Sequence, residues 1–219
     1  MVLKVVLLWN KAGVSLFSLP VCLSESIFEN LTAMKNSSLH QIIIALLACS
    51  LPLTLKAAPP KVGDNAPDFA LKTLDDQTVR LSDLTAGGRV VLIVLRGWPG
   101  YQCPLCTRQV QDYIASSPGF AEAKVRVVMV YPGPADSLVA HAKEFLENKQ
   151  WPRDFIYVTD PDYTMVNAYG LRWDAPQETA YPATFVLNPQ GKVLSAKISH
   201  SHGDRTKAGD ILEQLKRQP

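Results

Sequence analysis

Residues 89–116 read RVVLIVL (89–95), RGWPGYQCPLC (96–106) and TRQVQDYIAS (107–116). The first part is a continuous apolar run, mostly β-branched, which is typical of a strand that is covered on both faces of a sheet. Pro104 suits the first position of a helix, because that position has no helical partner for an N–H and the proline φ is already set. The stretch therefore predicts a buried strand, a tight loop and a helix that begins at Pro104.

Two cysteines lie at the predicted helix start. Cys103 is expected as the N-cap and Cys106 as the third helical residue, so both sulfurs lie near the unpaired N–H groups and the positive end of the helix dipole. That setting stabilises a thiolate, and two cysteines three residues apart on one helix face can form a disulfide. A C-x-x-C between a strand and a helix indicates redox chemistry.

Two other interpretations of the pair are open. A structural zinc site needs further ligands, yet the only other cysteines, Cys22 and Cys49, lie in the apolar N-terminal region. Buried cysteines can also be inert, since a free thiol packs like a small apolar side chain. Pro104 and the helix start favour the redox interpretation.

The composition suits one globular domain with an extension. The chain has 219 residues, of which 47% are hydrophobic and 19% charged, enough for a substantial core. The net charge of +2 gives no indication of a nucleic-acid partner.

Residues 34–58 have the pattern of a signal peptide: a lysine near Met34, a short apolar run, then small residues and prolines. The run at 42–55 is interrupted by Ser50 and Pro52 and is shorter than the roughly 18–20 residues of a membrane span. We expect export, to the periplasm, with a membrane tether through this N-terminal segment as the alternative. Residues 46–49 (LLAC) also resemble a lipoprotein cleavage box, so lipidation of Cys49 is a lesser alternative.

Residues 1–33 add a second apolar stretch ahead of this complete signal. They are interpreted as either a mis-assigned start or an extended leader, and we expect translation to begin at Met34. The folded domain is then expected over residues 59–219.

Within that domain, strand and helix patterns alternate. This order predicts an α/β fold, a three-layer α/β/α sandwich whose mixed central sheet has parallel central strands and one antiparallel edge. Strands are expected at 69–73, 78–81, 89–95, 124–131, 154–158, 181–187 and 192–199, and helices at 104–116, 135–149, 163–169 and 206–216.

Over residues 61–216 the chain resembles the thioredoxin-like superfamily, in its peroxiredoxin-like branch of alkyl hydroperoxide reductase and thiol-specific antioxidant proteins. The resemblance rests on the thiol loop and on short motifs at matching places: APDF at 66–69, Arg96-Gly97 at the strand end, PATF at 182–185 and NPQG at 188–191.

The resemblance implies two different registers for the thiols. Peroxiredoxins carry P-x-x-x-T-x-x-C, which places Pro99 at the proline and makes Cys106 the peroxidatic cysteine. Thioredoxin-type reductases carry C-x-x-C, in which the first cysteine, here Cys103, attacks and Cys106 resolves. Pro182 favours the second register, because thioredoxins place a cis proline opposite the disulfide. A trans peptide at Pro182 is the alternative.

The chain departs from the peroxiredoxin pattern at two positions. Cys103 stands where the threonine is expected, and Pro182 stands where an arginine would hold the peroxide. Arg96 is therefore either a replacement positive charge for the thiols or a strand-end residue paired at the surface. Trp98 and Tyr101 either shape the mouth of the site or serve as packing residues.

The function implied is a thiol-dependent antioxidant oxidoreductase that reduces peroxides through the Cys103–Cys106 pair and is reset by an external thiol reductant. The first alternative is an exported oxidoreductase acting on protein disulfides. The second is a thioredoxin-like module that binds Cu(I), although relatives of that kind carry C-x-x-x-C. No organic cofactor or metal is expected for either enzyme. Cys103, at the cap, is expected to be more exposed than Cys106.

Overall fold

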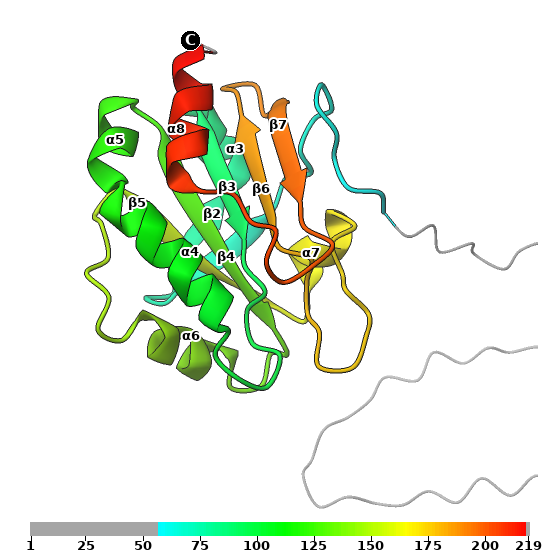
Figure 1. Cartoon of the computed structure of the whole chain (residues 1–219). Coiled ribbons are helices and arrows are strands. Elements are labelled where there is room, and N and C mark those ends of the chain that lie inside the picture. Colours follow the sequence, from blue (N-terminus) through cyan, green and yellow to red (C-terminus); the bar gives the residue numbers. More distant parts are fainter. Residues whose placement is uncertain (1–56, 218–219) are drawn as a thin grey trace, which may run out of the picture. The chain divides into compact units, whose positions relative to one another are not determined.

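The computed structural model describes residues 57–217, in which a seven-stranded mixed sheet lies between helices (Figure 1). The strand order is β2-β1-β5-β4-β3-β6-β7. The neighbours β3, β4 and β5 are parallel, and the remaining pairs are antiparallel. The strands are β1 (Ala70–Thr73), β2 (Thr78–Arg80), β3 (Val90–Val94), β4 (Arg126–Gly133), β5 (Phe155–Pro161), β6 (Ala183–Leu187) and β7 (Val193–Ile198).

Strand β3 lies inside the sheet, paired with β4 on one side and β6 on the other. All five of its residues are buried, as the continuous apolar run predicts. Successive side chains point to opposite faces, so Val91 and Ile93 join one core and Val90 and Leu92 the other. The site loop therefore leaves a strand that is fixed on both faces and at both edges.

Helices cover both faces of the sheet, which confirms the three-layer prediction. One core packs beneath α4, α5, α6 and α8, and the other beneath α3 and α7. In Figure 1, α4 and α8 lie on the near face and α3 and α7 behind the sheet. The helices are α3 (Leu81–Ala86), α4 (Pro104–Ala115), α5 (Ser117–Glu122), α6 (Leu138–Leu146), α7 (Thr164–Ala168) and α8 (Ala208–Arg217).

The sheet has antiparallel strands at both edges, where one such edge was predicted. The hairpin of β1 and β2 pairs antiparallel with β5 through Lys72 and Thr73, on the side away from β6 and β7. Helix α3 was not predicted either. It has six residues, and its N-cap, Arg80, makes no side-chain capping bond, so it lacks the usual sequence signal for a helix start.

The predicted start at Met34, the leader at residues 1–33, the cysteines Cys22 and Cys49, and nearly all of the signal at 34–58 lie outside the described residues. Within residues 57–217, no helix combines the length and apolar character that crossing a bilayer requires.

Candidate active site

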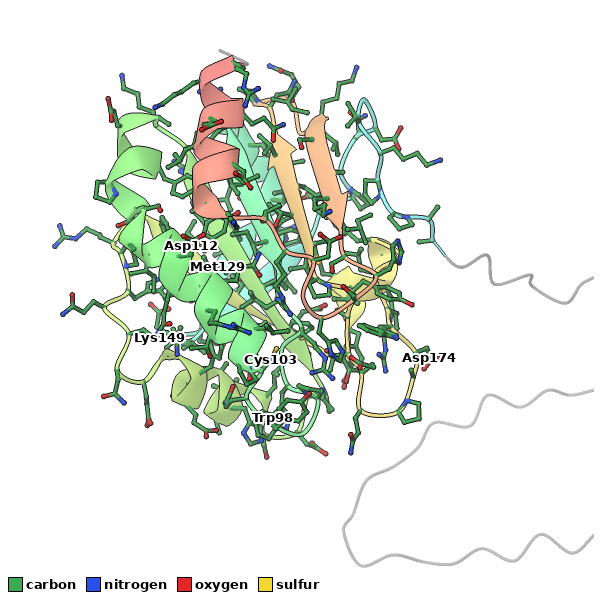
Figure 2. The ribbon with its side chains drawn as sticks, viewed as in Figure 1. Trp98, Cys103, Asp112, Met129, Lys149 and Asp174 are labelled. Atoms are coloured by element: carbon green, nitrogen blue, oxygen red, sulfur yellow. The ribbon has the colours of Figure 1, made fainter. Side chains whose placement is uncertain are left out.

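The two thiols occupy the helix start that the sequence predicts. Helix α4 begins at Pro104, Cys103 is its N-cap, and the Cys106 N–H donates to the Cys103 sulfur over 3.4 Å. Both cysteines are free thiols. In Figure 2, Cys103 lies at the end of α4 where the loop from β3 arrives, near Trp98. This arrangement surrounds one sulfur with helix N-terminal donors, which stabilise its anion.

The two sulfurs have opposite ionisation behaviour. The pKa of Cys103 is lowered to about 5, chiefly by a hydrogen bond from the Cys106 thiol, with help from backbone N–H groups and the positive charge of Arg205. Burial raises the pKa of Cys106, and the neighbouring Cys103 raises it further. Cys103 is 2% exposed and Cys106 is fully covered, so the order of exposure is as predicted but both are buried. These opposite shifts favour Cys103 as the thiolate and Cys106 as the partner that keeps its proton.

Arg205 is the cation beside the thiols, and no motif in the sequence points to it. Its Nη2 lies 3.8 Å from the Cys103 sulfur. Two neutral acceptors orient the guanidinium: the Gln109 Oε1 at 3.0 Å and the His202 carbonyl oxygen at 2.9 Å. Within residues 57–217, no carboxylate forms an ion pair with Arg205. Its charge is thus available to the thiolate.

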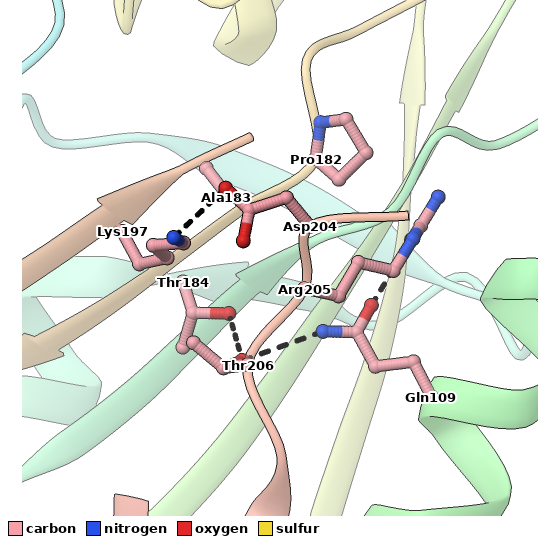
Figure 3. Close-up of a pocket in the computed structure, with 8 residues that line it drawn as sticks. All are labelled: Gln109, Pro182, Ala183, Thr184, Lys197, Asp204, Arg205 and Thr206. Atoms are coloured by element: carbon pink, nitrogen blue, oxygen red, sulfur yellow. Dashed lines mark hydrogen bonds and ion pairs between the residues drawn. The ribbon is translucent and has the colours of Figure 1, made fainter. Parts of the chain in front are cut away.

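A narrow hollow lies beside Arg205, between α4 and the loop ahead of α8 (Figure 3). The Thr206 hydroxyl lies 2.8 Å from the hydroxyls of both Thr184 and Tyr113, and it accepts from the Gln109 side-chain amide at 3.4 Å. These bonds fix the amide so that its oxygen faces Arg205. The hollow is too tight for a water molecule, so it positions side chains and does not hold a ligand.

Arg96 fits neither of its two sequence interpretations. It is buried, and its guanidinium donates to Glu178 at 2.7 Å, to the Tyr101 hydroxyl at 2.5 Å and to the Gln177 carbonyl at 2.7 Å. The bonds to Glu178 and Tyr101 raise the Arg96 pKa above its ordinary value, although burial opposes them. Arg96 is therefore a buried clamp between the thiol loop and the loop at 172–182, and Tyr101 belongs to this clamp.

The rest of the thiol loop is anchored to other elements. The backbone N–H of Trp98 bonds to the Pro132 carbonyl, and its indole stacks on His141 of α6 with centroids 3.5 Å apart. Gly97 precedes it at φ +68°, where a Cβ would collide with Pro132, so only glycine fits this close approach. Pro99 is half-buried in the bend that follows. Trp98 therefore packs on α6, as its packing interpretation predicts.

Pro182 lines the hollow next to Arg205. Its peptide bond is trans, however, as is every described peptide bond, so the cis geometry expected from thioredoxins is wrong. The Pro182 carbonyl accepts from the Ser199 N–H and the strand β6 begins at the next residue, so the residue is held as the start of a regular strand.

His200 and His202, two residues apart in the loop after β7, have different partners. The Nε2 of His202 lies 2.8 Å from Glu178, whereas the ring of His200 packs edge-on against Tyr181. Among residues 57–217, no three His, Cys, Asp or Glu side chains gather into a group suited to a metal ion. The Cu(I) alternative would therefore have to rely on the two thiols alone.

Known proteins similar to this chain fall into two groups. A putative peroxiredoxin of Helicobacter pylori is 32% identical over 160 residues, covering 71% of this chain and 97% of its own. The thiol-disulfide oxidoreductase ResA of Bacillus subtilis is 27% identical over 158 residues, covering 69% of this chain and 79% of its own. The structure of peroxidoxin BcpB from Mycobacterium tuberculosis has a TM-score of 0.57 at 23% identity, over 73% of this chain and 99% of that one.

The fold is thus the thioredoxin-like fold of peroxiredoxins, and the relatives are thiol peroxidases and thiol-disulfide oxidoreductases. The model of the AhpC/TSA family matches residues 62–196, a span that begins ahead of β1 and ends within β7 and so includes both thiols. This protein is a member of the AhpC/TSA family of thiol oxidoreductases.

Proposed function

We propose that the protein is a thiol-disulfide oxidoreductase in which Cys103 is the attacking nucleophile. The observation that carries the proposal is the asymmetry of the pair. Cys103 has a pKa near 5 and an arginine beside its sulfur, whereas Cys106 is fully covered with a raised pKa. A nucleophile must be a thiolate and must be reached by its substrate, and only Cys103 approaches both conditions.

The exchange proceeds in two steps. The Cys103 thiolate attacks one sulfur of a substrate disulfide, forming a mixed disulfide and releasing the other sulfur as a thiolate. Cys106 then gives up its proton to the released thiolate and attacks the Cys103 sulfur, which closes the Cys103–Cys106 disulfide and releases the reduced substrate. An external thiol reductant resets the pair by the reverse exchange.

Single cysteine variants test this order on a protein disulfide such as that of insulin. Cys103→Ser should abolish the reaction, whereas Cys106→Ser should accumulate a mixed disulfide that intact-mass analysis detects. A mixed disulfide on Cys106 in the Cys103→Ser variant would reverse the assignment, and no reduction by the wild-type protein would refute the function.

Peroxide reduction is the second candidate, and membership of the AhpC/TSA family favours it. In this reaction the Cys103 thiolate attacks a peroxide oxygen and becomes a sulfenic acid, while the other oxygen leaves, protonated, as water or an alcohol. Cys106 then condenses with the sulfenic acid to form the disulfide and water. The peroxiredoxin register names Cys106 as the attacking residue, but its burial and raised pKa favour Cys103 here.

A dimedone-type probe separates the candidates, because it labels sulfenic acid alone. If the protein reduces peroxides, peroxide treatment should give an adduct on Cys103 in Cys106→Ser. An adduct on Cys106 in Cys103→Ser would support the peroxiredoxin register, and no adduct in either variant would remove the peroxidase candidate.

The location of the reaction is also a proposal. The signal pattern at residues 34–58 supports export to the periplasm, with contact to the membrane limited to that segment. Detection of the protein in a periplasmic fraction, with its N-terminus sequenced, would test both export and cleavage.

A further inference from the structure

Three loops lie at the end of the sheet where β3 ends (Figure 1). They are the thiol loop at 95–103, the loop at 172–182 that leads into β6, and the loop at 199–207 between β7 and α8. The third loop carries Arg205 to Cys103. No regular element contains Arg205, so its position depends on what holds this loop.

Glu178 joins all three loops through its two carboxylate oxygens. One oxygen accepts from Arg96 at 2.7 Å, and Arg96 also donates to Tyr101 of the thiol loop. The other oxygen lies 2.8 Å from the Nε2 of His202. The Glu178 side chain is 11% exposed and Arg96 is buried, so their ion pair is little weakened by water and fixes the carboxylate, whereas the His202 side chain that meets it is 42% exposed.

His202 links this carboxylate to Arg205. Its ring is bound to Glu178, and its backbone carbonyl accepts the Nε–H of Arg205 at 2.9 Å. A carboxylate can only accept, so Nε2 donates the hydrogen, which both the neutral and the charged ring can do. The contact therefore does not require a particular protonation state of the ring.

The other attachments of the loop differ in kind. Asp204 pairs with Lys197 at 2.8 Å, but both side chains are about half exposed, and such pairs contribute little. Thr206 secures the end of the loop nearest α8 through Thr184 and Tyr113. Between β7 and Arg205, the His202–Glu178 contact is the one whose acceptor is a nearly buried carboxylate.

We propose that His202 is a positioning residue of the thiol site, whose ring, held by Glu178, keeps the Arg205 guanidinium against the Cys103 sulfur. The proposal rests on the proposed function, because it concerns how the Cys103 nucleophile is activated. Its consequence is that a side chain with no contact to either sulfur sets the fraction of Cys103 present as thiolate.

The test is the pH profile of iodoacetamide alkylation of the reduced protein, followed by mass spectrometry at Cys103. Cys103 has a pKa near 5, so near pH 5 the rate follows its thiolate fraction. Removing the His202–Glu178 contact in His202→Ala should raise this pKa by about half a unit, which lowers the rate at pH 5 roughly twofold and leaves the rate at pH 8 unchanged.

Two variants serve as controls. His202→Gln retains a side-chain N–H donor for Glu178 and should restore the wild-type profile. His200→Ala removes the neighbouring histidine, whose ring contacts Tyr181 and not Glu178, and should also match the wild type.

The proposal is overturned if His202→Ala keeps the wild-type profile, if its rate falls equally at pH 5 and pH 8, or if His200→Ala has the same effect. Alkylation requires no substrate. A wild-type protein that fails to reduce insulin would therefore refute the proposed function while the alkylation comparison still decides the role of His202.

Discussion

Arg96 lies in the thiol loop just after β3, and Arg205 lies beside Cys103 ahead of α8, but the two arginines differ in their partners. Arg96 is buried and bound to the Glu178 carboxylate, the Tyr101 hydroxyl and a backbone carbonyl. Arg205 is half-buried, and its partners are the Gln109 amide oxygen, a backbone carbonyl and the Cys103 sulfur. Each guanidinium thus has three contacts, yet only Arg96 has a carboxylate counter-ion.

This difference assigns separate tasks to the two charges. A carboxylate within hydrogen-bond distance cancels most of the field of an arginine, whereas amide and carbonyl oxygens orient the guanidinium and leave its net charge in place. Arg205 is therefore the charge that stabilises the Cys103 thiolate, and Arg96 joins two loops. Substitution of Arg96 should therefore affect mainly the stability of the fold, and substitution of Arg205 mainly the pKa of Cys103.

The largest effect should follow from Arg96→Ala. The substitution leaves the nearly buried Glu178 without its main counter-ion and opens the clamp on Tyr101, so we expect the free energy of unfolding to fall by about 3 kcal/mol. Chemical denaturation of the reduced protein measures this. Arg205→Ala is the matched control and should cost much less, since no buried carboxylate depends on it. Equal losses for the two variants would remove the distinction.

The second effect concerns the thiolate. In Arg205→Gln the charge 3.8 Å from the sulfur is lost, and the pKa of Cys103 should rise from about 5 by roughly one unit. Because the thiolate is the form present above the pKa, the alkylation rate at pH 5 should fall about fivefold, and the rate at pH 8 should not change.

Arg205→Lys, which keeps a positive charge without the planar fork, should give an intermediate profile. A wild-type profile in Arg205→Gln would mean that the helix start and the Cys106 thiol alone lower the pKa.

The parts of the site that the sequence predicts are local ones. Pro104 and the spacing of the cysteines determine the helix start and the N-cap, because both depend on a few consecutive backbone positions. Arg205 lies 102 residues from Cys103, and its contact exists only after β7 and α8 have packed. In the sequence it is one charged residue in a polar loop, with nothing to distinguish it from a solvated one.

The fold shows the same limit. The apolar run of β3 predicts a central strand, because burial on both faces is encoded in its own residues. The placement of the β1–β2 hairpin beside β5 depends on only two paired positions, at Lys72 and Thr73, which no local pattern specifies. The first backbone N–H of α8 is likewise bonded by Asp112 of α4, which lies 96 residues away in the sequence.

The smallest expected effect concerns the contact between Arg96 and Tyr101 of the thiol loop. Tyr101→Phe removes one acceptor of the Arg96 guanidinium and leaves Glu178 and the Gln177 carbonyl in place. Tyr101 is 44% exposed, so water can replace its hydroxyl, and the free energy of unfolding should fall by about 1 kcal/mol or less. The alkylation profile of Cys103 should stay at the wild-type midpoint, because Arg96 does not contribute its charge to the sulfur.

Tyr181→Phe, whose hydroxyl is not part of the Arg96 clamp, provides the reference for losing a tyrosine hydroxyl near the site. If Tyr101→Phe instead moves the Cys103 profile as Arg205→Gln is expected to, the Arg96 charge reaches the thiols and the two arginines act together.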